Sequence, residues 1–127
     1  MENSLKNKRT AGTIGEKMAE DYLKEHNYSI IAMNFRYKRL GEIDIIARDN
    51  GYVCFIEVKT RSNLEYGLPI EAVNYRKQEN IRKLASIFIC KNNLHNADIR
   101  FDVVEVYVRK EKELMNVEKI NLIKNAF

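Results

Sequence analysis

The sequence predicts an α/β fold in which helices flank a mixed central sheet. Two segments carry apolar residues at helical spacing, and four others alternate or are rich in β-branched and aromatic residues. Their order is helix, three strands, helix, strand, which is typical of this fold class. The chain has 127 residues, 45% hydrophobic and 31% charged, so we expect one domain over residues 1–127.

The first helix is expected at about residues 13–26. Its apolar residues at helical spacing are Ile14, Met18, Ala19, Tyr22 and Leu23. Thr13 and Glu16 have the spacing of a capping box, so the residues alone favour Glu16 as a helix cap. The preceding segment, residues 1–10, is polar and basic, and we expect it to form a flexible arm.

Three strands should follow, at residues 28–37, 41–48 and 52–60. The last two are separated by Asp49-Asn50-Gly51. An Asn-Gly pair favours a two-residue type I′ hairpin turn, because both residues tolerate a positive φ. The second and third strands are therefore expected to form a tight antiparallel hairpin.

The second helix is expected at about residues 75–91, with Asn74 as its N-cap, and the last clear strand at residues 98–108. A helix between two neighbouring strands predicts a parallel pair joined by a right-handed crossover. The tail from Lys110 has an ambiguous pattern, and both a strand and a short helix fit it.

The hairpin carries the residues with the clearest chemistry. Counting outward from the Asn50-Gly51 turn places Asp44 directly opposite Glu57. Like charges at opposed positions destabilise a sheet unless something compensates them, and a divalent cation would do so. Carboxylate ligands suit magnesium or manganese, so the pattern indicates a Mg²⁺ or Mn²⁺ site.

Lys59 lies two residues after Glu57 and should therefore share its sheet face. A fixed positive charge beside a metal can neutralise the charge that develops on a scissile phosphate. The alternative is a structural salt-bridge cluster with no ligand, which the Asp44, Glu57 and Lys59 spacing also allows.

Composition limits the partners and the compartment. The net charge of +4 and the isoelectric point near 9.0 favour an anionic partner such as nucleic acid. Basic residues cluster at three places, although each cluster alone also fits a solvated surface: Lys6, Lys8 and Arg9; Arg36, Lys38 and Arg39; Arg76, Lys77, Arg82 and Lys83.

Cys54 and Cys90 are expected to be buried free thiols. Neither His26 nor His95 has partners at catalytic or metal-ligand spacing, so both are expected to lie at the surface. The first residues lack the apolar core of a signal peptide, and no segment reaches the length of a membrane helix. We therefore expect a cytoplasmic protein. Nucleotide-binding GxGxxG and P-loop motifs and the serine-hydrolase GxSxG motif are absent from the sequence.

Several separated blocks resemble one known family in the same order. They are GEKMAEDYL at residues 15–23, GEIDIIARDNGYVCFIEVKTR at 41–61, RFDVV at 100–104 and the closing Asn125-Ala126-Phe127. These blocks resemble the YraN-type bacterial family of endonuclease-like proteins. That family is similar to archaeal Holliday-junction resolvases, within the restriction-endonuclease-like, PD-(D/E)xK superfamily.

The resemblance implies a restriction-endonuclease-like core and roles for individual residues. Asp44 and Glu57 would bind magnesium with the backbone carbonyl of Val58, and Lys59 would be the catalytic lysine. Glu16 would match the helix glutamate of the resolvase branch, so cap and outer metal residue both stay open for it. Ile43 departs from the pattern, because the superfamily's name has proline at this place.

The implied function is a metal-dependent nuclease for DNA, including branched or otherwise unusual structures, and junction cleavage would favour a homodimer. The residues expected to contact nucleic acid are Arg61, Arg76, Lys77 and Gln78. Two other functions remain open. The fold could be a non-catalytic nucleic-acid-binding module, or it could be a protein-assembly factor that does not bind nucleic acid.

Overall fold

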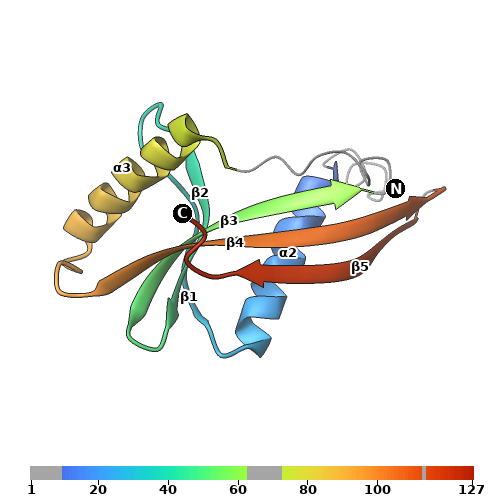
Figure 1. Cartoon of the computed structure of the whole chain (residues 1–127), viewed down its shortest axis with the longest axis horizontal. Helices are drawn as coiled ribbons and strands as arrows, with labels where there is room; N and C mark the ends of the chain where they lie inside the picture. The colour runs from blue at the N-terminus through green and yellow to red at the C-terminus, as the bar shows by residue number, and fades with distance from the viewer. Residues whose placement is uncertain (1–9, 63–72, 113) are drawn as a thin grey trace.

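A computed structural model describes residues 10–62, 73–112 and 114–127 (Figure 1). The elements in chain order are α2 (Thr10–Glu25), β1 (Ser29–Arg36), β2 (Glu42–Asp49), β3 (Tyr52–Ser62), α3 (Tyr75–Lys91), β4 (Asp98–Glu111) and β5 (Leu114–Ile123). This order confirms the predicted α/β class. Most of the expected basic arm, with Lys6, Lys8 and Arg9, lies outside the described residues.

The strands form one five-stranded mixed sheet in the order β1-β2-β3-β4-β5. Only β3 and β4 are parallel, and α3 connects them, as the helix between two strands predicted. The ambiguous tail is a strand, because β5 pairs antiparallel with β4. The β4 strand also runs three residues beyond the predicted end at residue 108.

The hairpin register agrees with the count from the turn. Asp49 pairs with Tyr52, and the β2–β3 ladder continues to the pair of Ile45 with Ile56. The turn itself differs from the prediction. Asn50 has a left-handed φ of 57°, whereas Gly51 is not left-handed, so a type I′ turn is not formed. A two-residue connection is enough to set the register.

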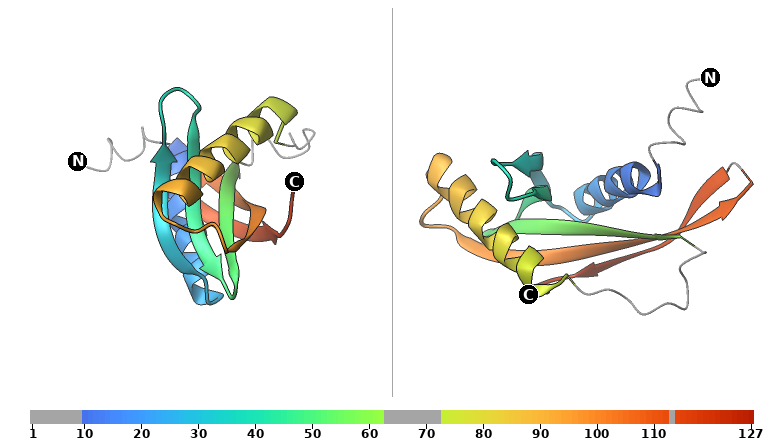
Figure 2. Two further views of the ribbon diagram at one scale, coloured as in Figure 1. Left: turned by 90° about the vertical axis from the view of Figure 1, so that its left-hand side faces the viewer. Right: turned by 90° about the horizontal axis from the view of Figure 1, so that it is seen from above.

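The two helices cover opposite faces of the sheet (Figure 2). Ala19 and Leu23 of α2 pack with Ile45, Ile56 and other residues in one buried cluster, which we call the α2-side core. Residues Ile81, Leu84, Ala85 and Phe88 of α3 pack on the other face, in the α3-side core. Residues 53–57 of β3 are therefore buried between the two cores, and a polar side chain there, such as that of Glu57, needs partners within the protein.

The helix ends test the capping predictions. Asn74 caps α3 as expected, since its side chain accepts a hydrogen bond from the Lys77 N–H at 2.8 Å. The capping interpretation of Glu16 is wrong, because α2 already begins at Thr10 and Thr13 lies inside the helix. A capping box forms only in the first turn of a helix, so the side chain of Glu16 is available for another role.

Two smaller expectations also have clear outcomes. Cys54 is buried, but Cys90 is exposed on α3, so the expectation of two buried thiols is half wrong. His26 and His95 are exposed, as predicted. Within the described ranges, no helix is both long and apolar enough to cross a membrane.

Candidate metal centre

Asp44 lies at a break in the side-chain alternation of β2, between Ile43 and Ile45. Ile43 packs in the α3-side core and Ile45 in the α2-side core. In a regular strand these two residues would share a face, because side chains alternate with a period of two. The neighbouring strand is irregular at the same level, where Asn34 has a φ of 53°. Asp44 can therefore meet side chains from both faces of the sheet.

A close helix contact brings Glu16 to Asp44. The preceding residue is Gly15, and a Cβ atom at this position would collide with Oγ1 of Thr60 on β3. Glycine thus allows α2 to approach the sheet more closely than any other residue would. The result is that Glu16 reaches the sheet from the α2 side.

Glu16, Glu42 and Asp44 form an acidic group in which one carboxylate oxygen of each lies within 4.8 Å of the others. Asn34 Nδ2 donates to Glu16 Oε1 at 3.0 Å and to Glu42 Oε2 at 2.7 Å. Arg36 lies across from Glu42, with Nη2 at 2.6 Å from Glu42 Oε1. One amide and one guanidinium therefore hold these carboxylates in place without balancing their charge.

The environment of Asp44 disfavours its charged form. Burial, followed by the negative charge of Glu57, raises the pKa of Asp44 well above its usual range. A hydrogen bond from the Val58 N–H to Asp44 Oδ2, at 2.8 Å, acts in the opposite direction but is outweighed. The structure thus brings Asp44 close to Glu57, although regular pairing ends one residue earlier at Ile45.

Glu57 approaches from the α3 side and is only 5% exposed. Its Oε2 forms an ion pair with Nζ of Lys77, in the first turn of α3. Its Oε1 is buried and has no hydrogen-bond partner, and it is the sole buried side-chain oxygen or nitrogen in this state within the described ranges. Such an atom calls for an explanation, because buried carboxylate oxygens nearly always have partners.

The other residues expected at the site are less closely engaged. Lys59 is half-buried on β3 in register with Glu105 of β4, and it makes no ion pair with the described residues. Val58 contributes its N–H to the site, while the predicted role of its carbonyl stays a prediction. Glu42, by contrast, pairs with β1 and joins the acidic group, which the hairpin count did not indicate.

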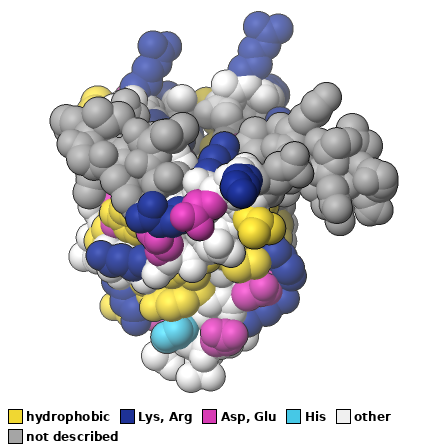
Figure 3. Space-filling model, turned by 90° about the vertical axis from the view of Figure 1, so that its right-hand side faces the viewer, with side chains coloured by type: hydrophobic (Ala, Val, Ile, Leu, Met, Phe, Trp, Pro, Cys, Tyr) yellow, Lys and Arg dark blue, Asp and Glu magenta, His cyan; other side chains and the backbone are white. Residues whose placement is uncertain are grey.

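The residues expected to bind nucleic acid lie on two elements. Arg61 is near the end of β3, and Arg76 is exposed in the first turn of α3. Gln78 is engaged within the protein, since its Nε2 donates to the Val73 carbonyl at 2.7 Å. At the end of the molecule toward which β3 runs, acidic side chains lie among Lys, Arg and hydrophobic ones (Figure 3). The described surface there has both charge signs.

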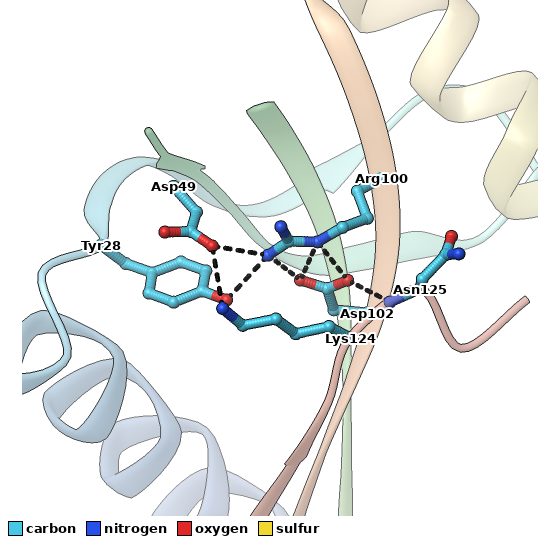
Figure 4. A network of polar contacts seen from close by, with 6 residues as sticks. All are labelled: Tyr28, Asp49, Arg100, Asp102, Lys124 and Asn125. Atoms are coloured by element: carbon cyan, nitrogen blue, oxygen red, sulfur yellow. Dashed lines mark hydrogen bonds and ion pairs between the residues drawn. The ribbon is translucent and has the colours of Figure 1, made fainter. Parts of the chain in front are cut away.

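Sequence reasoning missed a second polar cluster, which we call the Arg100 network (Figure 4). Its members are Tyr28, Asp49, Arg100, Asp102, Lys124 and Asn125. Arg100 Nη2 donates to Asp49 and Asp102 at 2.9 Å each and to the Tyr28 hydroxyl at 2.8 Å. Its contacts join residues 28 and 124, so no local spacing could have indicated it.

The residues of the first cluster fit a divalent cation. Carboxylate oxygens of Glu16, Glu42 and Asp44 lie within 4.8 Å of one another, and Glu57 is not part of this group, although its charge acts on Asp44. We call these four residues the acidic site. They supply only carboxylate oxygens, the ligand type that magnesium and manganese prefer. The unpartnered Oε1 of Glu57 is a free ligand atom already removed from water. These features define an α/β protein with a carboxylate site that could hold a metal ion.

Comparison with known proteins identifies the family. The model of the "Uncharacterised protein family UPF0102" matches residues 15–106. A UPF0102 protein of Acetivibrio thermocellus is 61% identical over 121 residues, covering 95% of this chain and 93% of its own length. One from Caldanaerobacter subterraneus subsp. tengcongensis is 46% identical, covering 95% of this chain and 97% of its own length. The chain belongs to the UPF0102 family, in agreement with the YraN-type resemblance.

Proposed function

We propose that this protein is a metal-dependent nuclease that hydrolyses phosphodiester bonds in DNA, with branched or otherwise unusual DNA structures as its substrates. The observation that carries the proposal is Glu57, which is 5% exposed and whose Oε1 has no hydrogen-bond partner among the described residues, beside the half-buried carboxylate of Asp44. A structural ion-pair cluster would complete these contacts within the chain.

In this proposal Asp44 and Glu57 hold Mg²⁺ or Mn²⁺, with the Val58 carbonyl as a further ligand. Glu16 lies within 4.8 Å of Asp44 and acts from the outer side of the site. When bound, the metal stabilises negative charge on the phosphate and lowers the pKa of a bound water. The resemblance to restriction-endonuclease-like proteins supports the same assignment.

Lys59 is proposed to stabilise the negative charge that develops on the phosphate in the transition state. It shares the sheet face of Glu57 and has no ion-pair partner among the described residues, so its charge is available to a phosphate. Arg61, Arg76, Lys77 and Gln78 are proposed to contact the nucleic-acid backbone. Such contacts release condensed counterions, so binding should weaken as salt increases.

The test is a cleavage screen with magnesium over duplex, single-stranded, flap and four-way DNA, for the wild type and Lys59→Met. We expect the variant to retain the fold and metal binding but to cleave at least about a hundredfold more slowly, as for loss of one preorganised charge. Asp44→Ala and Glu57→Ala should lose most metal binding by calorimetry.

The outcomes separate the proposed functions. Salt-dependent DNA binding without cleavage of any substrate would favour the non-catalytic binding module. Absence of binding to any nucleic acid would favour the assembly factor. Full cleavage by a destabilised Lys59→Met protein would reject the catalytic role of Lys59 and identify it as a structural residue.

A further inference from the structure

Lys77 contacts the same carboxylate that the proposed metal needs. Its Nζ pairs with Oε2 of Glu57, and the other oxygen of that carboxylate has no partner among the residues that the structure describes. Within the described residues, Lys77 is the one cation paired with Glu57. An ammonium group and a divalent cation would therefore compete for one buried carboxylate.

The two partners differ in how easily they can move. The side chain of Lys77 is 43% exposed, whereas that of Glu57 is 5% exposed. Glu57 is fixed in the centre of the sheet, but the lysine ammonium can turn outward to water on its flexible four-carbon chain. The backbone of Lys77 does not need to move, because its N–H is held by the Asn74 cap at 2.8 Å.

We infer that Lys77 is an exchangeable positioning residue, which pairs with Glu57 in the metal-free protein and releases it when a divalent cation binds. The inference rests on the proposed metal site. A doubly charged ion interacts more strongly with the carboxylates of the acidic site than a single ammonium does, and the half-exposed lysine is the partner that can leave.

The exchange would link metal binding to nucleic-acid binding. Lys77 lies next to Arg76 in the first turn of α3, at the rim of the acidic site. Once released from Glu57, its ammonium can contact a phosphate. The divalent cation and the nucleic acid would both stabilise the conformation in which Lys77 is released. Binding of either one should therefore strengthen binding of the other, because coupling between binding sites is reciprocal.

The contrast with Asp102 argues against a permanent structural pair. Asp102 is fully buried, and both of its oxygens accept hydrogen bonds, from Arg100 and from the Asn125 N–H. Glu57 is almost as buried but has only the lysine on one oxygen. The contacts of Glu57 are thus those of a carboxylate whose remaining partner, here the proposed metal ion, is still to bind.

The first experiment measures the accessibility of Lys77 in the wild-type protein by amine labelling and mass spectrometry, with and without magnesium chloride. Lys83 is the internal reference, because it is an exposed lysine of the same helix. We expect magnesium to raise the labelling rate of Lys77 to the level of Lys83, which itself should not change. In Glu57→Gln, Lys77 should label at that rate without magnesium.

The second experiment is calorimetric titration of the wild type, Lys77→Met and Arg76→Met with manganese chloride. Lys77→Met should bind about tenfold more tightly than the wild type, the order expected when one competing charge is removed. Arg76→Met controls for the general loss of positive charge from this turn and should change the affinity less.

Unchanged labelling of Lys77 in magnesium chloride, in a protein that calorimetry shows to bind magnesium as well as manganese, would overturn the exchange but leave the proposed metal site intact. Equal affinities for Lys77→Met and Arg76→Met would also overturn it. If neither the wild type nor Lys77→Met binds manganese, the metal site itself is wrong, and the proposed function fails with it. Labelling of the wild type keeps the test decisive if a variant does not fold.

Discussion

The Arg100 network and the acidic site are both groups of buried or half-buried charges beside the sheet, but they are completed differently. In the network, Arg100 and Lys124 oppose Asp49 and Asp102, so two positive charges meet two negative ones. In the acidic site, four carboxylates meet only two cations in the described chain: Glu16, Glu42, Asp44 and Glu57 against Arg36 and Lys77.

The difference is also visible in the pKa shifts. Burial works against the charged form of Asp49, but hydrogen bonds from Arg100 and Lys124 prevail and keep its pKa below the usual value. At Asp44, burial and the charge of Glu57 prevail, and the pKa is raised. A charged group that serves the fold is completed by the chain itself, whereas an incomplete one costs stability and is typical of a functional site.

The largest effect is expected in the network. Arg100→Met leaves Asp102, which is fully buried, without its main partner, and should lower the free energy of unfolding by about 3–5 kcal/mol. Urea denaturation measures the loss. Arg76→Met, an exposed arginine, should stay within about 0.5 kcal/mol of the wild type. Similar losses for the two variants would show that the network does not hold the fold.

A ligand should complete the acidic site in the way that the chain completes the network. Magnesium at a hundred times its dissociation constant should stabilise the wild type by about 2.7 kcal/mol, because it binds only the folded state. Glu57→Gln should lose most of this gain, since it removes the charge of a buried ligand. Thermal denaturation with and without magnesium measures it, and an equal gain in the variant would contradict the site.

Removing a charge from the acidic site should stabilise the metal-free protein. Asp44→Asn keeps an oxygen for the Val58 N–H, and we expect its free energy of unfolding at neutral pH to rise by about 0.5–2 kcal/mol. The raised pKa means that the native state binds its proton more tightly than the unfolded state does. The contribution of Asp44 to stability should thus fall as pH rises above the ordinary value of 3.8, until the native pKa is passed.

Denaturation curves at several pH values, without metal, compare the wild type with Asp44→Asn. The wild-type stability should decline more steeply over that range, because the variant lacks the titrating group. Parallel pH profiles, or a less stable variant at neutral pH, would mean that Asp44 is a satisfied structural residue like Asp102.

The smallest effect is expected at the rim of the network. Lys124 contacts Asp49 at 3.2 Å, but its side chain is 54% exposed, so water screens the pair. Lys124→Met should cost less than about 1 kcal/mol in the same urea experiment. A loss as large as that of Arg100→Met would show that the C-terminal contact, and not the buried guanidinium, completes the network.

The elements and the hairpin were predictable from local patterns. The apolar stripe and Asn74 predicted α3 at its observed bounds, 75–91, and the Asn50-Gly51 turn predicted the β2–β3 register. Both depend on neighbours in the chain, which is why periodicity and turn chemistry could identify them. The capping interpretation of Glu16 failed because the spacing of Thr13 and Glu16 does not say where the helix begins.

By itself, the sequence determined the α/β class and brought Asp44 and Glu57 near one another, because a short turn joins their strands. Only the tertiary structure decided which other groups surround them. Packing of α2 and α3 on opposite faces brings Glu16 from one side and Lys77 from the other, while the irregular level of β1 and β2 adds Glu42. Such contacts join residues far apart in the chain, and their geometry depends on how whole elements pack, which no local spacing records.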